Sequence, residues 1–220
     1  MSRDQQREQK HRRIDLVSPL TAVQPFAVAY INYAERIIDC KVVYYGPESS
    51  GKSCNLLYIY ERTRSSDGGM QQVPSQSSDG VTYDYLPLSL GEIRGFQTRF
   101  HLFTVPGHAS CTSARLLLLK GLDGVIFVAD SQEQRMAANA ESAAELSEFL
   151  KQHGYALEKL PFVVQYNKRD LPNAASRESM DEALRLGAPI YEAIATKGVG
   201  VFDALKDISK LVLTELKKGS

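Results

Sequence analysis

The sequence predicts an α/β fold in which a mostly parallel sheet is covered by helices on both faces. Short apolar runs at 40–45, 124–129 and 161–166 are typical of strands that are buried on both sides. Longer helical patterns lie between these runs, which implies right-handed crossover connections. The chain has 220 residues, 43% of them hydrophobic, which is enough for one domain with a sizeable core.

A polar, basic N-terminal segment precedes the first predicted strand and helix. Residues 1–25 are polar and rich in Arg and Lys, and we interpret them as an extension, largely disordered, before a single domain at 26–220. A strand at 40–45 breaks at Gly46-Pro47 and leads to a helix at 53–62. Residues 64–80 are rich in Ser, Gly, Gln and Asp, so we expect a mobile loop there.

The rest of the domain alternates strands and helices. Two strands are expected at 81–88 and 98–105, with Gly91 and Gly95 at the reversal between them. Helix 111–120 carries Arg115 and Lys120, which we expect on a solvated or partner-facing surface. Strands at 124–129, 161–166 and, more weakly, 190–195 alternate with helices at 133–152, 176–186 and 200–217.

Charge and cysteine content narrow the function classes. The 26 basic and 26 acidic residues cancel, so nothing indicates nucleic acid or a membrane surface as a main partner. The three scattered cysteines suit a reducing compartment and have no metal-ligand spacing. With no membrane-spanning run, signal core or lipidation pattern, we expect a cytoplasmic monomer without a membrane anchor, placed in the cell by protein partners.

A phosphate-binding loop is predicted at 46–53, where the sequence matches G-x-x-x-x-G-K-[ST] between a strand and a helix. Backbone N–H groups of such a loop point at phosphate oxygens. Gly51 allows close approach, Lys52 reaches the β- and γ-phosphates, and the Ser53 hydroxyl binds Mg²⁺. The residues expected to contact a nucleotide here are Gly46, Glu48, Ser49, Ser50, Gly51, Lys52, Ser53 and Cys54.

A second loop, Asn167-Lys-Arg-Asp170, predicts which base is bound. It follows a predicted parallel strand, at whose carboxyl end ligands bind in open α/β sheets. The Asp170 carboxylate can accept hydrogen bonds from guanine N1–H and the 2-amino group, whereas adenine offers neither donor. Asn167 is expected to tie the loop to neighbouring backbone, and the Lys168 stem to cover the base.

With both loops in place, the sequence resembles the Ras-like GTPases, and more narrowly the MglA-type gliding and polarity GTPases of bacteria. The resemblance runs from about Ala27 to the C-terminus, and Thr104-Val-Pro-Gly107, with Thr where most Ras-like proteins have Asp, is itself typical of the MglA group. Its most telling stretches are 41–47, 84–88, 95–107, 122–131, 167–172 and 192–196.

The resemblance implies the P-loop small GTPase fold, with a six-stranded sheet and about five helices. It also implies that GDP or GTP binds with Mg²⁺, that the Gly107 N–H senses the γ-phosphate, and that the Ala195 N–H, near Thr196, makes a last guanine contact. The implied partners are a Roadblock-type (MglB-like) activating protein or polarity scaffolds that contact the switch loops. The implied process is control of cell polarity, gliding motility or type IV pili, with recruitment to a cell pole.

Four departures from the family surround the expected γ-phosphate position. His108 stands where Gln usually orients the attacking water, and its ring lacks the paired donor and acceptor of an amide. Glu48 stands where relatives have a small residue, usually Gly, and adds negative charge. By alignment, Asp79 takes the place of an intrinsic Arg and Gly80 that of the Mg²⁺-binding Thr, for which Thr82 or Ser78 could substitute.

These departures predict a switch whose intrinsic GTP hydrolysis is slow or lost, with His108 as the candidate catalytic residue. Three alternatives stay open at this point. The chain is an active GTP hydrolase with a competent His108 or an Arg supplied in trans, a scaffold that holds one nucleotide permanently, or a P-loop ATPase or kinase. The Asn167–Asp170 loop argues against the last of these.

Overall fold

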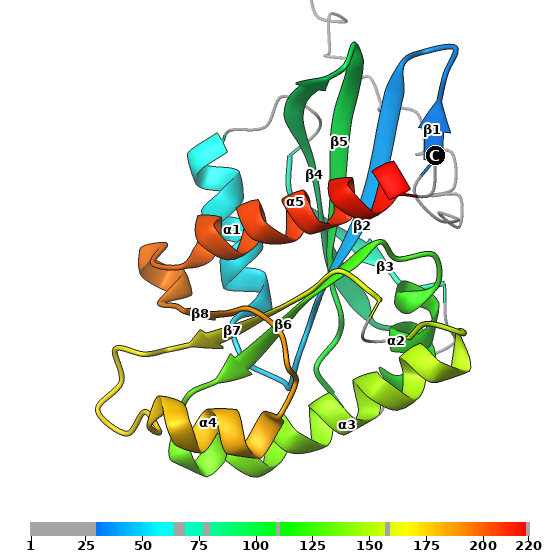
Figure 1. Cartoon of the computed structure of the whole chain (residues 1–220). Coiled ribbons are helices and arrows are strands. Elements are labelled where there is room, and N and C mark those ends of the chain that lie inside the picture. Colours follow the sequence, from blue (N-terminus) through cyan, green and yellow to red (C-terminus); the bar gives the residue numbers. More distant parts are fainter. Residues whose placement is uncertain (1–29, 64–68, 77–79, 109–110, 157–158, 219–220) are drawn as a thin grey trace, which may run out of the picture.

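The computed structural model describes residues 30–63, 69–76, 80–108, 111–156 and 159–218 (Figure 1). The extension predicted at 1–25 lies outside these residues, as do Ser78 and Asp79. The described strands are β1 Tyr30–Asn32, β2 Ile37–Tyr45, β3 Gln71–Pro74, β4 Thr82–Ile93, β5 Phe96–Thr104, β6 Gly124–Asp130, β7 Phe162–Asn167 and β8 Ile190–Glu192. The helices are α1 Lys52–Thr63, α2 Thr112–Leu119, α3 Met136–Gln152, α4 Arg177–Leu184 and α5 Val201–Lys218, with 3-10 turns η2 Glu133–Arg135 and η3 Ala195–Lys197.

All of these strands form one mixed sheet in the order β3-β4-β5-β2-β6-β7-β8, with β1 paired to β2. The five strands from β5 to β8 run parallel, while β3 and β4 are antiparallel to their neighbours. The predicted α/β fold with helices on both faces is therefore confirmed. The described part of the sheet has eight strands rather than the six that the resemblance implied.

The two additional strands, β1 and β3, lie in segments where we predicted no strand. Strand β3 falls inside the segment that we predicted as a loop, and it pairs with β4 through Gln71↔Tyr85 to Pro74↔Thr82. Its four residues carry one aliphatic side chain, Val73, because an edge strand needs only backbone pairing on one side. Strand β1 is three residues long and forms a hairpin with the start of β2.

The reversal between β4 and β5 is also placed differently from the prediction. The turn is made by Arg94 and Gly95, which both have positive φ, a conformation that suits two-residue hairpin turns. Gly91 lies within β4, at the register shift between Ser89 and Glu92. A glycine inside a strand is a common sign of such a bulge.

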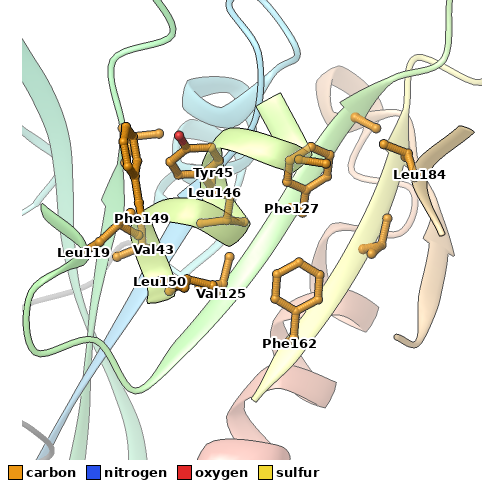
Figure 2. Packing of buried hydrophobic residues seen from close by; sticks show 14 of the residues in the cluster. Val43, Tyr45, Leu119, Val125, Phe127, Leu146, Phe149, Leu150, Phe162 and Leu184 are labelled. Atoms are coloured by element: carbon orange, nitrogen blue, oxygen red, sulfur yellow. The ribbon is translucent and has the colours of Figure 1, made fainter. Parts of the chain in front are cut away.

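The hydrophobic residues of the central strands divide between two cores because successive side chains point to opposite faces. Val43 and Phe127 pack toward α2, α3 and α4, in the cluster of Figure 2. Val42 and Ile126, one residue earlier in each strand, pack toward α1 and α5 on the other face. This double coverage explains why the stretches 42–45 of β2 and 125–129 of β6 are continuously apolar.

Candidate nucleotide-binding site

The predicted phosphate loop leaves the carboxyl end of β2 and enters α1 at Lys52. The Lys52 side chain is 6% exposed, and its Nζ donates to the carbonyl oxygens of Gly46 (2.9 Å) and Pro47 (2.7 Å). The ammonium group therefore lies inside the curve of its own loop. The nearby Ser50 Oγ is buried and has no hydrogen-bond partner among the described residues, so the loop holds a polar atom that a phosphate could satisfy.

Burial, together with the nearby charge of Arg115, lowers the pKa of Lys52 to about 7. Glu48 and Asp84 raise it and Arg135 lowers it, so all four charged side chains lie around this one ammonium group. Asp84, Arg115 and Arg135 come from β4, α2 and η2, respectively. A cation held out of water among these charges is poised to receive an anion.

Asn167 connects the phosphate loop to the two loops expected around the base. Its side chain is buried, donates from Nδ2 to Ser50 O (2.8 Å) and accepts at Oδ1 from the Ala195 N–H (2.9 Å). A Cβ at Gly51 would lie 2.1 Å from Asn167 Nδ2, so the phosphate loop needs glycine there for close approach. Three segments that are distant in sequence are thus held together by one amide.

This bridge predicts that Asn167→Ala lowers the free energy of unfolding by about 2–4 kcal/mol, because Ser50 O and the Ala195 N–H both lose a buried partner. Urea denaturation of the purified protein measures the change. Asn173→Ala is the matched control, since Asn173 donates to Gln134 at an exposed position, and we expect it to stay within about 0.5 kcal/mol of wild type. Equal effects of the two substitutions would contradict the bridging role.

The resemblance implied that the Ala195 N–H contacts guanine. In the structure this N–H instead donates to Asn167 Oδ1. Ala195 is buried at the start of η3, whereas its neighbour Thr196 is exposed. Asp170 is also exposed, and its Oδ2 lies 2.9 Å from Lys197 Nζ. The hydrogen bond from Lys197 holds the pKa of the Asp170 carboxyl below its usual range, so this side chain is an ionised acceptor at neutral pH.

Lys168 adopts a left-handed conformation (φ 66°), and its Nζ donates to Asp130 Oδ2 at 2.6 Å. Asp130 ends β6 and is 1% exposed, and its Oδ1 accepts from the backbone and the side chain of Gln132. This contact ties the end of the Lys168 side chain to the carboxyl end of β6. A non-glycine residue in this region of φ is a strained feature that clusters at ligand sites.

The segment 104–108 closes the site from the side of β5. The Thr104 hydroxyl donates to the Asp84 carboxylate (3.2 Å), so a carboxylate lies beside the position where most Ras-like proteins have Asp. A Cβ at Gly107 would lie 2.4 Å from the Cα of Glu48, which means that the two backbones are in contact. The predicted catalytic residue His108 lies here, with its Nε2 2.9 Å from Glu48 Oε1.

Arg115 holds this segment in place. Its guanidinium donates to the carbonyl oxygens of Pro106 (2.9 Å) and Gly107 (2.8 Å) and to that of His108, and it pairs with Glu145 of α3. Glu145 in turn accepts from the hydroxyl of Tyr45 at 2.8 Å. Arg115 is 6% exposed, so our expectation of a solvated or partner-facing Arg115 is wrong. It is buried because three backbone carbonyls and a carboxylate replace its water.

Residues 35–212 match the ADP-ribosylation factor family. The chain belongs to this family of Ras-like small GTPases. It is also 55% identical over 194 residues to the Mutual gliding-motility protein MglA of Myxococcus xanthus (strain DK1622), across 87% of this chain and 100% of that protein. The chain is therefore a GTP-binding switch protein of the MglA type, as the sequence predicted.

The side chains of this GTPase that could bind a metal ion beside the phosphates carry hydroxyl or carboxylate oxygens. Ser53 is exposed at the second position of α1, and Thr82 is exposed at the first position of β4, where it pairs with Pro74. Asp84 adds a carboxylate close to Lys52. Hydroxyl and carboxylate oxygens together with phosphate oxygens are the ligands that Mg²⁺ prefers. Groups of three or more His, Cys, Asp or Glu able to hold a metal ion do not occur among the described residues.

Several residues of this GTPase site were not predicted from the sequence. These residues lie outside the two nucleotide motifs and are brought to the site by the fold. They are Asp84 of β4, Arg135 of η2, Glu145 of α3 and Lys197 of η3. Arg135 is an example, because it comes from η2 and its Nη2 donates to Glu48 O at 2.7 Å. No helix in the described part of the chain is long and apolar enough to cross a membrane.

Proposed function

We propose that this GTPase binds GDP and GTP·Mg²⁺ as a molecular switch that controls cell polarity or motility through partner proteins. The observation that carries the proposal is the Asn167 bridge between the phosphate loop and the loop that follows β8. In this proposal the ammonium of Lys52 binds the phosphates, and the Asp170 carboxylate, held ionised by Lys197, binds the base. That arrangement suits a ligand with phosphates at one end and guanine at the other.

Most of the predicted residues have a role in this proposal. Gly46, Ser49, Ser50, Gly51 and Cys54 supply backbone N–H groups, and Lys52 neutralises phosphate charge. Ser53 binds Mg²⁺, with Thr82 or Asp84 completing its surroundings. Asp170 accepts from guanine, Lys168 covers the base, and the exposed Thr196 backbone is better placed than that of Ala195 for the last base contact. Gly107 senses the third phosphate.

We infer that intrinsic GTP hydrolysis is slow or lost. The Nε2 atom of His108 contacts the Glu48 carboxylate and is therefore not free to orient a water molecule. Arg115 is committed to carbonyl oxygens and Glu145, so it is not free to act as a cationic stabiliser of the transition state. Loss of a water-orienting residue and of a catalytic cation together would slow hydrolysis by roughly 10³-fold or more.

The proposal is tested by chromatography of the nucleotide that the purified full-length protein releases after long incubation with excess GTP and Mg²⁺. We expect guanine nucleotide at about one equivalent per chain, with GTP still intact after hours. Accumulation of GDP would show a working hydrolase and overturn slow hydrolysis. Displacement of bound GDP by GTP but not by ATP is the second expected result, and displacement by ATP would favour a P-loop ATPase.

The switch is proposed to act through segments near 64–95 and 106–115 whose arrangement responds to the third phosphate. A Roadblock-type activating protein or a polarity scaffold is the expected partner. The expected location is the cytoplasm, with recruitment to a cell pole by that partner. The relative from Myxococcus xanthus, whose name refers to gliding motility, supports this assignment. Binding of a purified Roadblock-type protein in the presence of a GTP analogue but not of GDP would be the supporting result.

A further inference from the structure

Two of the residues by which this chain departs from the MglA-type pattern contact each other. Glu48 Oε1 of the phosphate loop and His108 Nε2, beyond β5, lie 2.9 Å apart. Their side chains are 49% and 71% exposed, so the contact lies at the mouth of the site. In a chain with glycine and glutamine at these positions, this contact could not form.

Both ends of the contact are anchored by buried or partly buried arginines. Arg135 Nη2 donates to the backbone carbonyl of Glu48, and Arg115 donates to the carbonyls of 106–108. Between the two anchors the backbones already touch, since a Cβ at Gly107 would lie 2.4 Å from Glu48 Cα and 2.7 Å from Glu48 N. A phosphate group cannot lie between these two segments unless they separate.

The position of Lys52 indicates which phosphate of a bound nucleotide would approach the contact between the phosphate loop and 106–108. Its Nζ contacts the carbonyls of Gly46 and Pro47, immediately before Glu48. The lysine of a phosphate loop reaches the β- and γ-phosphates, so the last phosphate of a triphosphate approaches the Glu48 side of the loop. There it meets the Glu48 carboxylate, and two negative charges that come close together near a protein surface repel each other.

We propose that Glu48 and His108 form a latch that favours a nucleoside diphosphate over a triphosphate. The latch rests on the proposed guanine-nucleotide binding and adds to it a basis for discriminating between its two ligands. In the latched state, 106–108 lies on the phosphate loop and leaves the diphosphate site complete. A triphosphate binds only when the Glu48–His108 contact opens and Gly107 moves away from the loop.

The size of the effect follows from the exposure of the pair. A single exposed contact between polar or charged side chains changes an equilibrium by about fivefold or less. Removal of the Glu48 charge also removes repulsion of the third phosphate, for which roughly a further twofold to fivefold is expected at a solvated position. We therefore expect the affinity ratio of triphosphate to diphosphate to rise about tenfold in Glu48→Gln and about threefold in His108→Gln.

The experiment uses full-length protein loaded with a fluorescent GDP analogue, which is displaced by GDP or by GTPγS in the presence of Mg²⁺. The measured quantity is the ratio of the two dissociation constants in wild type, Glu48→Gln, His108→Gln and the double variant. Glu178→Gln, an exposed charge change at the start of α4, is the control and should leave the ratio unchanged. The double variant should resemble Glu48→Gln alone, because the two side chains act as one contact.

The outcomes separate the latch from the function on which it rests. If GDP binds but the ratio is the same in all variants, the latch is wrong and nucleotide binding stands. If the effects of the two single variants multiply in the double variant, Glu48 repels the phosphate independently of His108, which also contradicts the latch. If wild type binds neither nucleotide, the proposed function itself fails.

Discussion

Asp170→Asn is expected to weaken GDP and GTP binding by about 10²- to 10⁴-fold. The carboxylate is expected to accept two hydrogen bonds from guanine, and a hydrogen bond to a charged group contributes about 1.5–3 kcal/mol. The amide keeps one acceptor but turns an NH₂ group toward the 2-amino group of guanine, so two donors face each other. Titration with fluorescent GDP measures the loss.

The same substitution predicts a gain for a different base. Xanthine carries a carbonyl at the position of the 2-amino group of guanine, so it can accept from the amide of Asp170→Asn while its N1–H donates to the amide oxygen. XDP should therefore bind the variant more tightly than GDP, in reverse of wild type. Asp203→Asn, an exposed change of the same kind in the first turn of α5, should alter neither affinity.

The outcome also decides whether Asp170 recognises the base at all. The pKa of its carboxyl is held below the usual range by Lys197, so it remains ionised throughout the range from pH 6 to 8. Any change of guanine affinity across that range thus has another source. If Asp170→Asn binds GDP as wild type does, the loop at 167–170 does not determine base specificity.

The fold could be predicted from sequence largely because its central strands are buried on both faces. Runs such as Val125-Ile-Phe-Val128 fill two cores at once and leave no polar position to obscure the pattern. Strand β3 could not be predicted, since Gln71-Gln-Val-Pro74 pairs through its backbone and carries no apolar alternation. Edge strands depend on what their neighbour offers, which a single sequence does not show.

The two nucleotide motifs could be recognised because a phosphate loop requires fixed residue types at fixed spacing. The residues that hold those motifs in place could not, because their spacing depends on the folded arrangement. Arg115 on α2 and Glu145 on α3 are thirty residues apart in sequence. On a helix taken alone, Arg115 has no feature that distinguishes it from a solvated arginine, and only the carbonyls of 106–108 make it a buried one.

Arg115→Met is expected to destabilise the protein by about 3–5 kcal/mol. Methionine fills a similar volume but leaves the Pro106 and Gly107 carbonyls without this donor and leaves Glu145 as a partly buried charge without its cation. For a chain of this size, about 1 kcal/mol shifts the melting temperature by roughly 2–4 °C, so a fall of about 10 °C is expected. Thermal and urea denaturation both measure it.

The network predicts how partner substitutions combine with this one. Arg115→Lys should fall between wild type and Arg115→Met, because a single ammonium cannot span three carbonyls and a carboxylate as the planar guanidinium does. Removing the charge of Glu145 in Arg115→Met/Glu145→Gln should restore part of the lost stability, since the uncompensated carboxylate is gone. Arg177→Met, at an arginine with a 51% exposed side chain on α4, should cost less than about 0.5 kcal/mol. If Arg115→Met is no more destabilising than Arg177→Met, segment 104–108 is held by its own backbone contacts, and its contact with the phosphate loop does not depend on α2.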